Sequence, residues 1–273
     1  MLGKLLKYEI KDTARIIPFL YLITIIFSAL SFISKKLDLG WITITSSFLL
    51  IVVGIAVVII TFVVIVIRFS RNLYSNEGYL MFTLPVKPQL LLVSKTVVAF
   101  SWIIISLIIL TGALFVGMYG FGFDFNELAK NIAEFEKYGL GNIFCLLIPM
   151  ILLLVIYLIA QIFFSITVAN RPAFHGLGTA AGFLVFLATY TILQVVNSVL
   201  AIFIPLSVEV NLVGNVSASL SSKNMLGFIM QSMDGNEPTT IIIGLGGYIF
   251  EVIITFVLFY MTGRMMNKKV SLK

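Results

Sequence analysis

One acidic residue, Glu251, lies inside an apolar run that extends from Pro238 to Arg264. A carboxylate in such surroundings carries a high free-energy cost unless it is protonated, paired or in contact with water. Ionisable groups in membrane-spanning segments serve as substrate contacts, proton relays or locks between subunits. A structural acid, hydrogen-bonded inside a helical bundle, is the alternative. The sequence leaves these interpretations of Glu251 open.

Three amide side chains lie inside two other apolar runs of the chain. They are Gln161, Gln194 and Asn197. Buried amides either line a polar cavity or cross-link neighbouring helices by hydrogen bonds. Together with Glu251, they are the candidate residues of a translocation path.

Glycines at two places would let helices approach each other closely. Gly244, Gly246 and Gly247 precede Glu251, and Gly178 and Gly182 have the small-x-x-x-small spacing. Such faces bring two helix backbones together, either within one chain or between two chains.

The motifs of several enzyme classes are missing from the sequence. There is no G-x-x-x-x-G-K-[ST] phosphate loop, no G-x-S-x-G nucleophile elbow and no H-E-x-x-H zinc motif. The chain has one Cys and one His, so it forms no internal disulfide and has no paired-histidine metal site. We therefore expect no catalytic residue, no metal ligand and no cofactor bound by this chain.

The composition excludes an ordinary soluble enzyme. Of the 273 residues, 60% are hydrophobic and only 11% are charged. Soluble domains have about a quarter of their residues charged, because a water-facing globule needs a polar surface. The net charge of +6 is therefore interpreted first by where the basic residues lie relative to a membrane.

Six apolar runs are long enough to cross a bilayer, which takes about 20 helical residues. The predicted spans are 16–34, 41–67, 96–123, 139–169, 173–207 and 239–263. A membrane β-barrel would instead show short segments of alternating polarity. The sequence thus predicts an all-α polytopic membrane protein, with residues 1–273 as a single transmembrane domain.

The basic residues predict the orientation. Thirteen Lys and Arg fall at the ends and connections of one side, against five on the other. The more basic side of a membrane protein is cytoplasmic. We therefore expect both termini in the cytoplasm and eight acidic residues outside.

The N-terminal segment 1–15 has an amphipathic helical pattern. Four cations lie within one narrow arc of it: Lys4, Lys7, Lys11 and Arg15. Leucines lie on the opposite side, although Glu9 interrupts them. This pattern is typical of an interfacial helix on the inner leaflet, with its cations toward anionic headgroups. Ordinary positive flanking charge explains it equally well.

The connection 68–95 is predicted to be cytoplasmic, yet residues 78–86 in its middle carry no charge. Pro85 and Pro88 exclude a further span. Apolar and aromatic side chains in a water-facing loop need a cover, which is either the chain's own bundle or a partner.

Two connections are predicted to lie on the outer side. Asp124 is a plausible helix N-cap, so 124–137 is expected to form a short outer helix. Residues 209–238 are too long for a structureless loop in a small protein and favour an amphipathic or re-entrant piece.

Two segments resemble a known family. The stretch 76–86 (NEGYLMFTLPV), followed by Ser94-Lys95, is similar to the cytoplasmic loop of permease subunits of bacterial type-2 ABC exporters. The opening MLGKLLKYE, with Arg15 before the first span, also resembles the members of that family from low-GC Gram-positive (Firmicutes-like) bacteria.

The resemblance implies a function for each segment. Residues 1–15 would be an elbow helix, and 209–238 would hold short outer re-entrant helices. The connection 68–95 would carry a coupling helix that docks on a separate ATPase. The residues implied for docking are Arg71, Asn72, Tyr74, Glu77, Gly78, Tyr79, Leu80, Phe82 and Leu84.

The resemblance also implies partners. Two ATPase copies would bind ATP and Mg²⁺, and a second permease chain, identical or different, would complete the transporter in the bacterial plasma membrane. The substrate expected from the apolar spans is an amphipathic or hydrophobic peptide, antibiotic or lipid. One alternative is an ATP-independent transporter or channel that uses Glu251. Another is a membrane sensor or scaffold that transports nothing.

Overall fold

The computed structural model describes residues 2–74, 87–124, 130, 141–171, 174, 180–211, 218–222, 224–227 and 240–268. Within these residues, six helices are long and apolar enough to cross a membrane. The shortest has 20 residues, which matches a hydrocarbon core of roughly 30 Å. The prediction of an all-α polytopic membrane protein is confirmed, with one small sheet added to it.

The chain forms two compact units. The N-terminal unit comprises residues 1–129 with 271–273, and the C-terminal unit comprises residues 130–270. The sequence predicted one domain, because six apolar runs show no soluble linker between them. The division falls within the polar stretch 124–137, where an outer helix was predicted. Apart from Asp124 and Lys130, that stretch lies outside the described residues.

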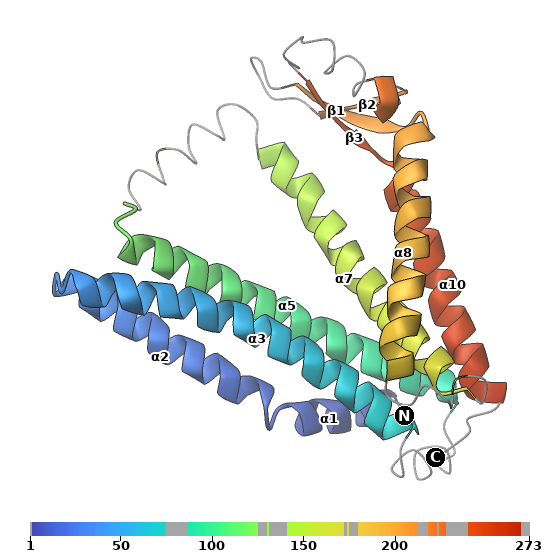
Figure 1. Ribbon diagram of the computed structural model, residues 1–273, viewed down its shortest axis with the longest axis horizontal. Coiled ribbons are helices and arrows are strands. Elements are labelled where there is room, and N and C mark those ends of the chain that lie inside the picture. The colour runs from blue at the N-terminus through green and yellow to red at the C-terminus, as the bar shows by residue number, and fades with distance from the viewer. Residues whose placement is uncertain are drawn as a thin grey trace. The chain divides into compact units, whose positions relative to one another are not determined.

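Within the described residues, the N-terminal unit contains four helices. They are α1 (Leu2–Thr13), α2 (Ile17–Lys36), α3 (Trp41–Tyr74) and α5 (Pro88–Gly120). Helices α2, α3 and α5 pack pairwise along their lengths, and α1 contacts α5 (Figure 1). Ile17, Tyr21 and Val57 form a buried core cluster, against which Trp102 packs.

The turn between α2 and α3 is tight. Asp38 has φ of 52° and Gly40 has φ of 43°, so both lie in the left-handed region. Asp and Gly are residues that accept this conformation. Just after the C-terminal end of α5, Gly122 has φ of 101°, a left-handed conformation that ends the helix.

The helices on either side of the predicted connection 68–95 extend into it. Helix α3 continues to Tyr74, and α5 begins at Pro88. The prediction ended the spans at Arg68 and Lys95 because charged residues rarely lie inside a membrane. Both cations form ion pairs with α1, so the helices continue through them. Proline favours the first position of a helix, which explains the start of α5.

The C-terminal unit contains three long helices that contact one another pairwise. They are α7 (Gly141–Ala169), α8 (Ala180–Phe203) and α10 (Gly246–Lys268). Tyr157, Ala160 and Leu258 form a core cluster between α7 and α10. Helix α8 ends at Phe203, two residues before Pro205, because the residue before a proline disfavours the helical conformation. The predicted span 173–207 is therefore too long at its end.

A three-stranded antiparallel sheet follows α8, where the sequence predicted a helical or re-entrant piece. Its strands are β1 (Ser207–Asn211), β2 (Ala218–Ser221) and β3 (Thr240–Gly244), in the order β2-β1-β3. The helical prediction for 209–238 is wrong at β1 and β2, since short strands with alternating side chains show no helical period. Glu209 pairs with Ser219 on one side and with Ile242 on the other.

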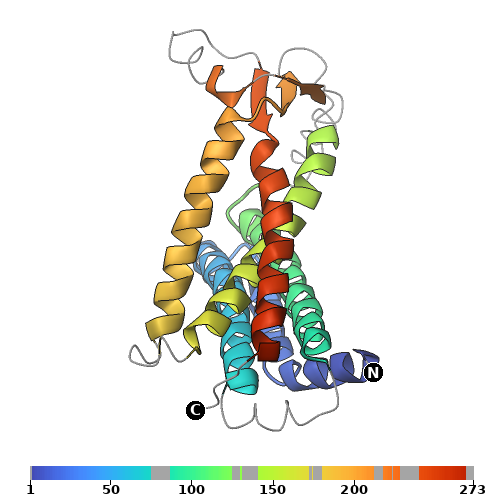
Figure 2. The ribbon, with the colours of Figure 1, turned by 90° about the vertical axis from the view of Figure 1, so that its right-hand side faces the viewer.

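The start of the last span also differs from the prediction. Residues 240–244 belong to strand β3, and α10 begins at Gly246 rather than at 239. The run Thr-Ile-Ile-Ile is β-branched, and such residues prefer strands. A Cβ on Gly244 would lie 2.3 Å from the carbonyl oxygen of Ala201, so the glycine permits β3 to reach α8. Helix α8 ends at the sheet and α10 begins at it (Figure 2).

Candidate functional site

The last turn of α3 holds three residues of the predicted ATPase-docking set, Arg71, Asn72 and Tyr74. Asn72 and Tyr74 are buried, and the Tyr74 ring lies 6.4 Å from the Phe69 ring, measured between centroids. Arg71 is exposed. The end of α3 is therefore packed into its own unit, and among these three only Arg71 presents an exposed side chain.

The other six residues of the docking set lie outside the described residues. They are Glu77, Gly78, Tyr79, Leu80, Phe82 and Leu84. Their role in docking stays a prediction. The structure does describe the two helix ends on either side of them, Tyr74 and Pro88.

The side chains of helix α1 differ in exposure between its two sides. The side chains of Lys4, Lys7, Lys11 and Arg15 are all exposed. On the other side, Leu5, Leu6 and Glu9 are half-buried and Thr13 is buried. The location of this helix on the inner leaflet stays a prediction.

A nearly buried ion pair joins α1 to α5. The Nζ atom of Lys95 donates to Oε1 of Glu9 at 2.5 Å. The Lys95 side chain is 4% exposed and that of Glu9 is 12% exposed. The glutamate that interrupts the leucine side of α1 is therefore the partner of the lysine in α5. Either charge alone at this depth would be strongly destabilising.

A second ion pair joins α1 to α3. A guanidinium nitrogen of Arg68 lies 2.5 Å from a carboxylate oxygen of Asp12, and Asp12 is more than half exposed. Surface pairs of this kind contribute little to stability, because water and ions screen them. The Arg68–Asp12 pair therefore orients α1 against α3. Breaking the Glu9–Lys95 pair costs more free energy, because its two charges are nearly buried.

Hydrogen bonds continue from the end of α1 into the bundle. The indole nitrogen of Trp102 donates to the Thr13 hydroxyl at 2.7 Å. The Tyr21 hydroxyl lies 3.2 Å from the Trp102 carbonyl oxygen and 2.8 Å from the Ser106 hydroxyl. Ser106 in turn donates to Thr61 at 3.0 Å. All four helices of the N-terminal unit thus contribute to one polar network.

These contacts place α1 across the two helix ends that border residues 75–87. The Asp12 contact is six residues before the end of α3, and the Glu9 contact is seven residues after the start of α5. A force applied to the residues between these ends would therefore reach α1 through α3 and α5. We call the two ion pairs, Glu9–Lys95 and Asp12–Arg68, the α1 clamp.

Glu251 lies in the second turn of α10, close to the sheet, because β3 occupies the residues predicted to begin its helix. Its side chain is buried, with 7% exposed. The Asn197 amide of α8 donates to Oε1 of Glu251 at 2.9 Å. Of the states open to an acid in an apolar segment, the structure shows a hydrogen-bonded pair between two helices.

A second amide pair lies on α7. Gln161 is 1% exposed, and its amide nitrogen donates to the Tyr157 hydroxyl at 2.8 Å. Each of the three long helices of the C-terminal unit thus contributes buried polar groups in addition to its apolar core.

Three oxygens of these side chains have no hydrogen-bond partner among the described residues. They are Oε1 of Gln161, Oδ1 of Asn197 and Oε2 of Glu251. An unpaired buried acceptor costs about 1–3 kcal/mol, so such groups are normally satisfied. All three are acceptors and can therefore take hydrogen bonds from a donor such as water or an amine.

Gln194 differs from the other predicted polar residues. It is exposed on α8, where its backbone oxygen accepts from Ser198. The structure thus brings Asn197 to Glu251 and Gln161 to Tyr157, and it leaves Gln194 on the outer face. Within the described residues, no group of three His, Cys, Asp or Glu is placed to hold a metal ion.

Several polar contacts of the N-terminal unit were missed from sequence. The Tyr21–Ser106–Thr61 bonds join residues of ordinary type in three apolar runs, and nothing in their spacing predicts them. The Glu9–Lys95 pair had a signal, because a glutamate on an apolar helix face and a lysine before an apolar run are both anomalous. Opposite charges at two such anomalies indicate a pair.

Comparison of this chain with protein families, curated proteins and solved structures finds no match. The function is therefore argued from the residues and the geometry, together with the resemblance of the two segments described above.

Proposed function

We propose that this chain is the transmembrane permease subunit of an ATP-driven exporter. Six membrane-spanning helices and the absence of a phosphate loop fit a subunit that crosses the membrane while another chain binds ATP. The resemblance of residues 1–9 and 76–86 to type-2 ABC exporter permeases supports the same assignment.

The α1 clamp is the structural observation that carries this proposal. A coupling loop must transmit motion to the membrane helices rather than move freely beside them. The helix ends that border residues 75–87 are tied to α1 by the Asp12–Arg68 and Glu9–Lys95 pairs. A partner that pulls on this loop would therefore move α1, α3 and α5 together as one body.

The working assembly would contain two permease chains, identical or different, and two ATPase subunits with ATP and Mg²⁺. Both chain ends and residues 75–87 would face the cytoplasm, following the distribution of Lys and Arg. An amphipathic or hydrophobic substrate would cross the bacterial plasma membrane when ATP binding closes the ATPase pair and shifts the permease halves.

The experiment is co-purification of the tagged full chain with the ATPase encoded beside it. Tyr79→Asp and Phe82→Asp introduce charge into the uncharged part of the loop, and we expect each to reduce the recovered ATPase several-fold. Phe123→Asp is the matched control, since Phe123 is an exposed aromatic residue beyond the opposite end of α5. Equal recovery from all chains would reject the proposed docking surface.

A second candidate function is ATP-independent transport through the C-terminal unit. It is favoured by Glu251, which is buried in an apolar helix and keeps one oxygen unpaired among the described residues. It predicts that vesicles containing this chain alone show transport driven by a pH gradient, and that Glu251→Gln abolishes it. Transport that requires ATP and the partner, and that persists in Glu251→Gln, supports the first candidate.

A further inference from the structure

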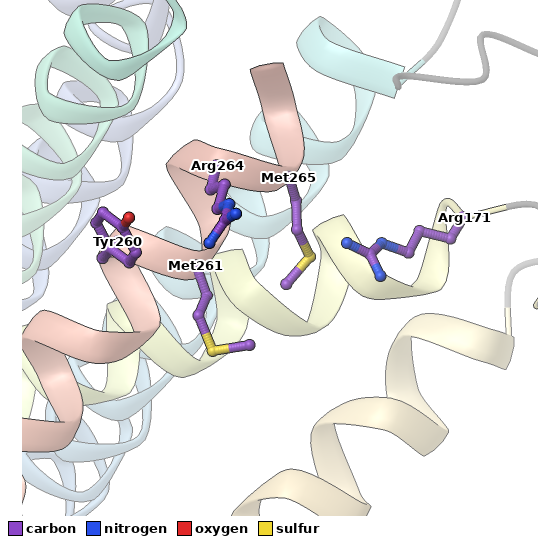
Figure 3. A pocket seen from close by; sticks show the side chains of 5 residues that line it. All are labelled: Arg171, Tyr260, Met261, Arg264 and Met265. Atoms are coloured by element: carbon purple, nitrogen blue, oxygen red, sulfur yellow. The ribbon is translucent and has the colours of Figure 1, made fainter. Parts of the chain in front are cut away.

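A pocket lies at the end of the C-terminal unit that is opposite the three-stranded sheet. Its volume is about 230 Å³. Five side chains from the ends of α7 and α10 line it: Arg171, Tyr260, Met261, Arg264 and Met265. In Figure 3, Arg171 extends from the end of α7 towards Met265, and Arg264 lies on the far side of that methionine.

The charge of this pocket is entirely positive. Arg171 follows the end of α7 and Arg264 lies in α10, and the lining contains no carboxylate. Neither guanidinium forms an ion pair with any residue that the structure describes. The planar guanidinium group matches the oxygens of a phosphate in a two-bond geometry, so two of them favour a phosphate ligand.

The rest of the lining is apolar or amphipathic. Met261 and Met265 have flexible thioether side chains that adapt to irregular apolar ligands. Tyr260 is exposed at the same end of α10, and tyrosine is typical of the headgroup level of a membrane. The part of α10 that is long and apolar enough to cross a bilayer extends to Met266, which would place the pocket where lipid headgroups meet acyl chains.

We infer that this pocket binds an anionic phospholipid. Arg171 and Arg264 hold the headgroup phosphate, and the methionines contact the first part of an acyl chain. Basic pockets between membrane helices on the cytoplasmic side recognise lipids in this way. Ordinary flanking cations would satisfy the charge rule without converging on one pocket from two helices. The inference does not depend on the proposed function.

The test uses the full chain, purified in a neutral detergent and titrated with phosphatidylglycerol or phosphatidylcholine of identical acyl chains. Bound lipid is counted by native mass spectrometry. We expect phosphatidylglycerol to bind more tightly, and Arg171→Gln with Arg264→Gln to weaken it at least about tenfold. Lys35→Gln with Lys36→Gln removes the same charge from the end of α2 and should leave binding unchanged.

A charge-preserving pair separates loss of binding from loss of fold. Arg171→Lys with Arg264→Lys keeps both charges but loses the two-bond geometry, so we expect intermediate affinity for phosphatidylglycerol. Inorganic phosphate is added as a competitor, and it should displace the lipid only in large excess. Three results would each overturn the inference: equal affinity for both lipids, unchanged binding in the Gln pair, or displacement by equimolar phosphate.

Discussion

Glu9 and Lys95 form an ion pair of 2.5 Å although 86 residues separate them in the chain. The pair lies almost out of solvent, between a short amphipathic helix and a helix long enough to span a membrane. It converts a surface segment into a fixed part of the N-terminal unit. The segment 1–15 also has four exposed cations on its other side. Its acidic residue Glu9 thus packs against α5, while its cations face the surroundings.

Removing one member of this pair should destabilise the N-terminal unit. In Glu9→Gln, the buried Lys95 ammonium loses its counter-charge, and we expect a loss of about 3 kcal/mol in the free energy of unfolding. Thermal or denaturant unfolding of the purified chain in detergent measures it. The double variant Glu9→Gln with Lys95→Met removes the unpaired charge and should recover most of the loss. A double variant as unstable as Glu9→Gln would contradict the buried pair.

That double variant also tests whether the α1 clamp transmits motion. It should remain folded and should still bind the ATPase, because residues 75–86 are unchanged. We expect its substrate-stimulated ATP hydrolysis to fall several-fold, since one of the two ion pairs of the α1 clamp is gone. Lys36→Met, which removes a lysine from the far end of α2, is the control. Full stimulation in the double variant would show that α1 plays no part in coupling.

Tyr21→Phe should weaken the N-terminal unit by about 1 kcal/mol. The hydroxyl of Tyr21 joins α2 to two groups of α5, the Trp102 carbonyl oxygen and the Ser106 hydroxyl. Removal leaves the bond from Ser106 to Thr61 in place. Tyr8→Phe is the matched substitution at an exposed position and should change the free energy of unfolding by only a few tenths of a kcal/mol. Equal effects of both substitutions would argue against the network.

Gly246→Ala should destabilise the contact between α10 and α8. A Cβ at this position would lie 2.5 Å from the carbonyl oxygen of Leu200, a backbone atom that cannot move alone. Gly182→Ala on α8 has nothing within 4 Å and should be neutral or stabilising, since alanine favours helices. Both variants add one methyl group, so the difference between their unfolding temperatures measures the effect of the close contact between α10 and α8. A tolerated Gly246→Ala would show that α8 lies farther from α10.

Asn197→Leu should destabilise the C-terminal unit by about 2 kcal/mol, because it removes the donor to the buried Glu251 carboxyl group. Gln194→Leu lies one turn earlier on the same helix but on its exposed face, and we expect almost no effect. Unfolding of the purified chain provides the measurement. Adding Glu251→Leu to Asn197→Leu should restore part of the stability. A larger loss in Gln194→Leu would mean that the two amides have exchanged roles.

Sequence predicted the six long helices well and their ends less well, for one physical reason. A membrane-spanning helix needs about 20 apolar residues, and that requirement is visible in the composition of the run itself. The ends of a span are less visible, because a charge can lie within a helix when another segment neutralises it. Arg68 and Lys95 are such charges, and their partners lie in α1.

The sheet and the polar pairs show the same limit. The run 240–244 is β-branched and therefore had a local signal for a strand, but its apolar character made it look like the start of a span. The choice of Asn197 over Gln194 as the partner of Glu251 depends on which face of α8 meets α10. Periodicity alone does not decide that, because both amides lie in an apolar run with apolar residues all round.

In each ion pair of the α1 clamp the two partners are far apart in the sequence, and this separation sets an order of events during synthesis. Glu9 and Asp12 leave the ribosome early. Arg68, the partner of Asp12, follows only after α2 and most of α3 have been made. Lys95, the partner of Glu9, follows only after all of α3 and the first turns of α5. During that interval Glu9 and Asp12 lack these partners. Insertion of α5 then brings Lys95 to Glu9, so the final packing of α1 against α5 is expected to be a late step in the synthesis and insertion of the chain.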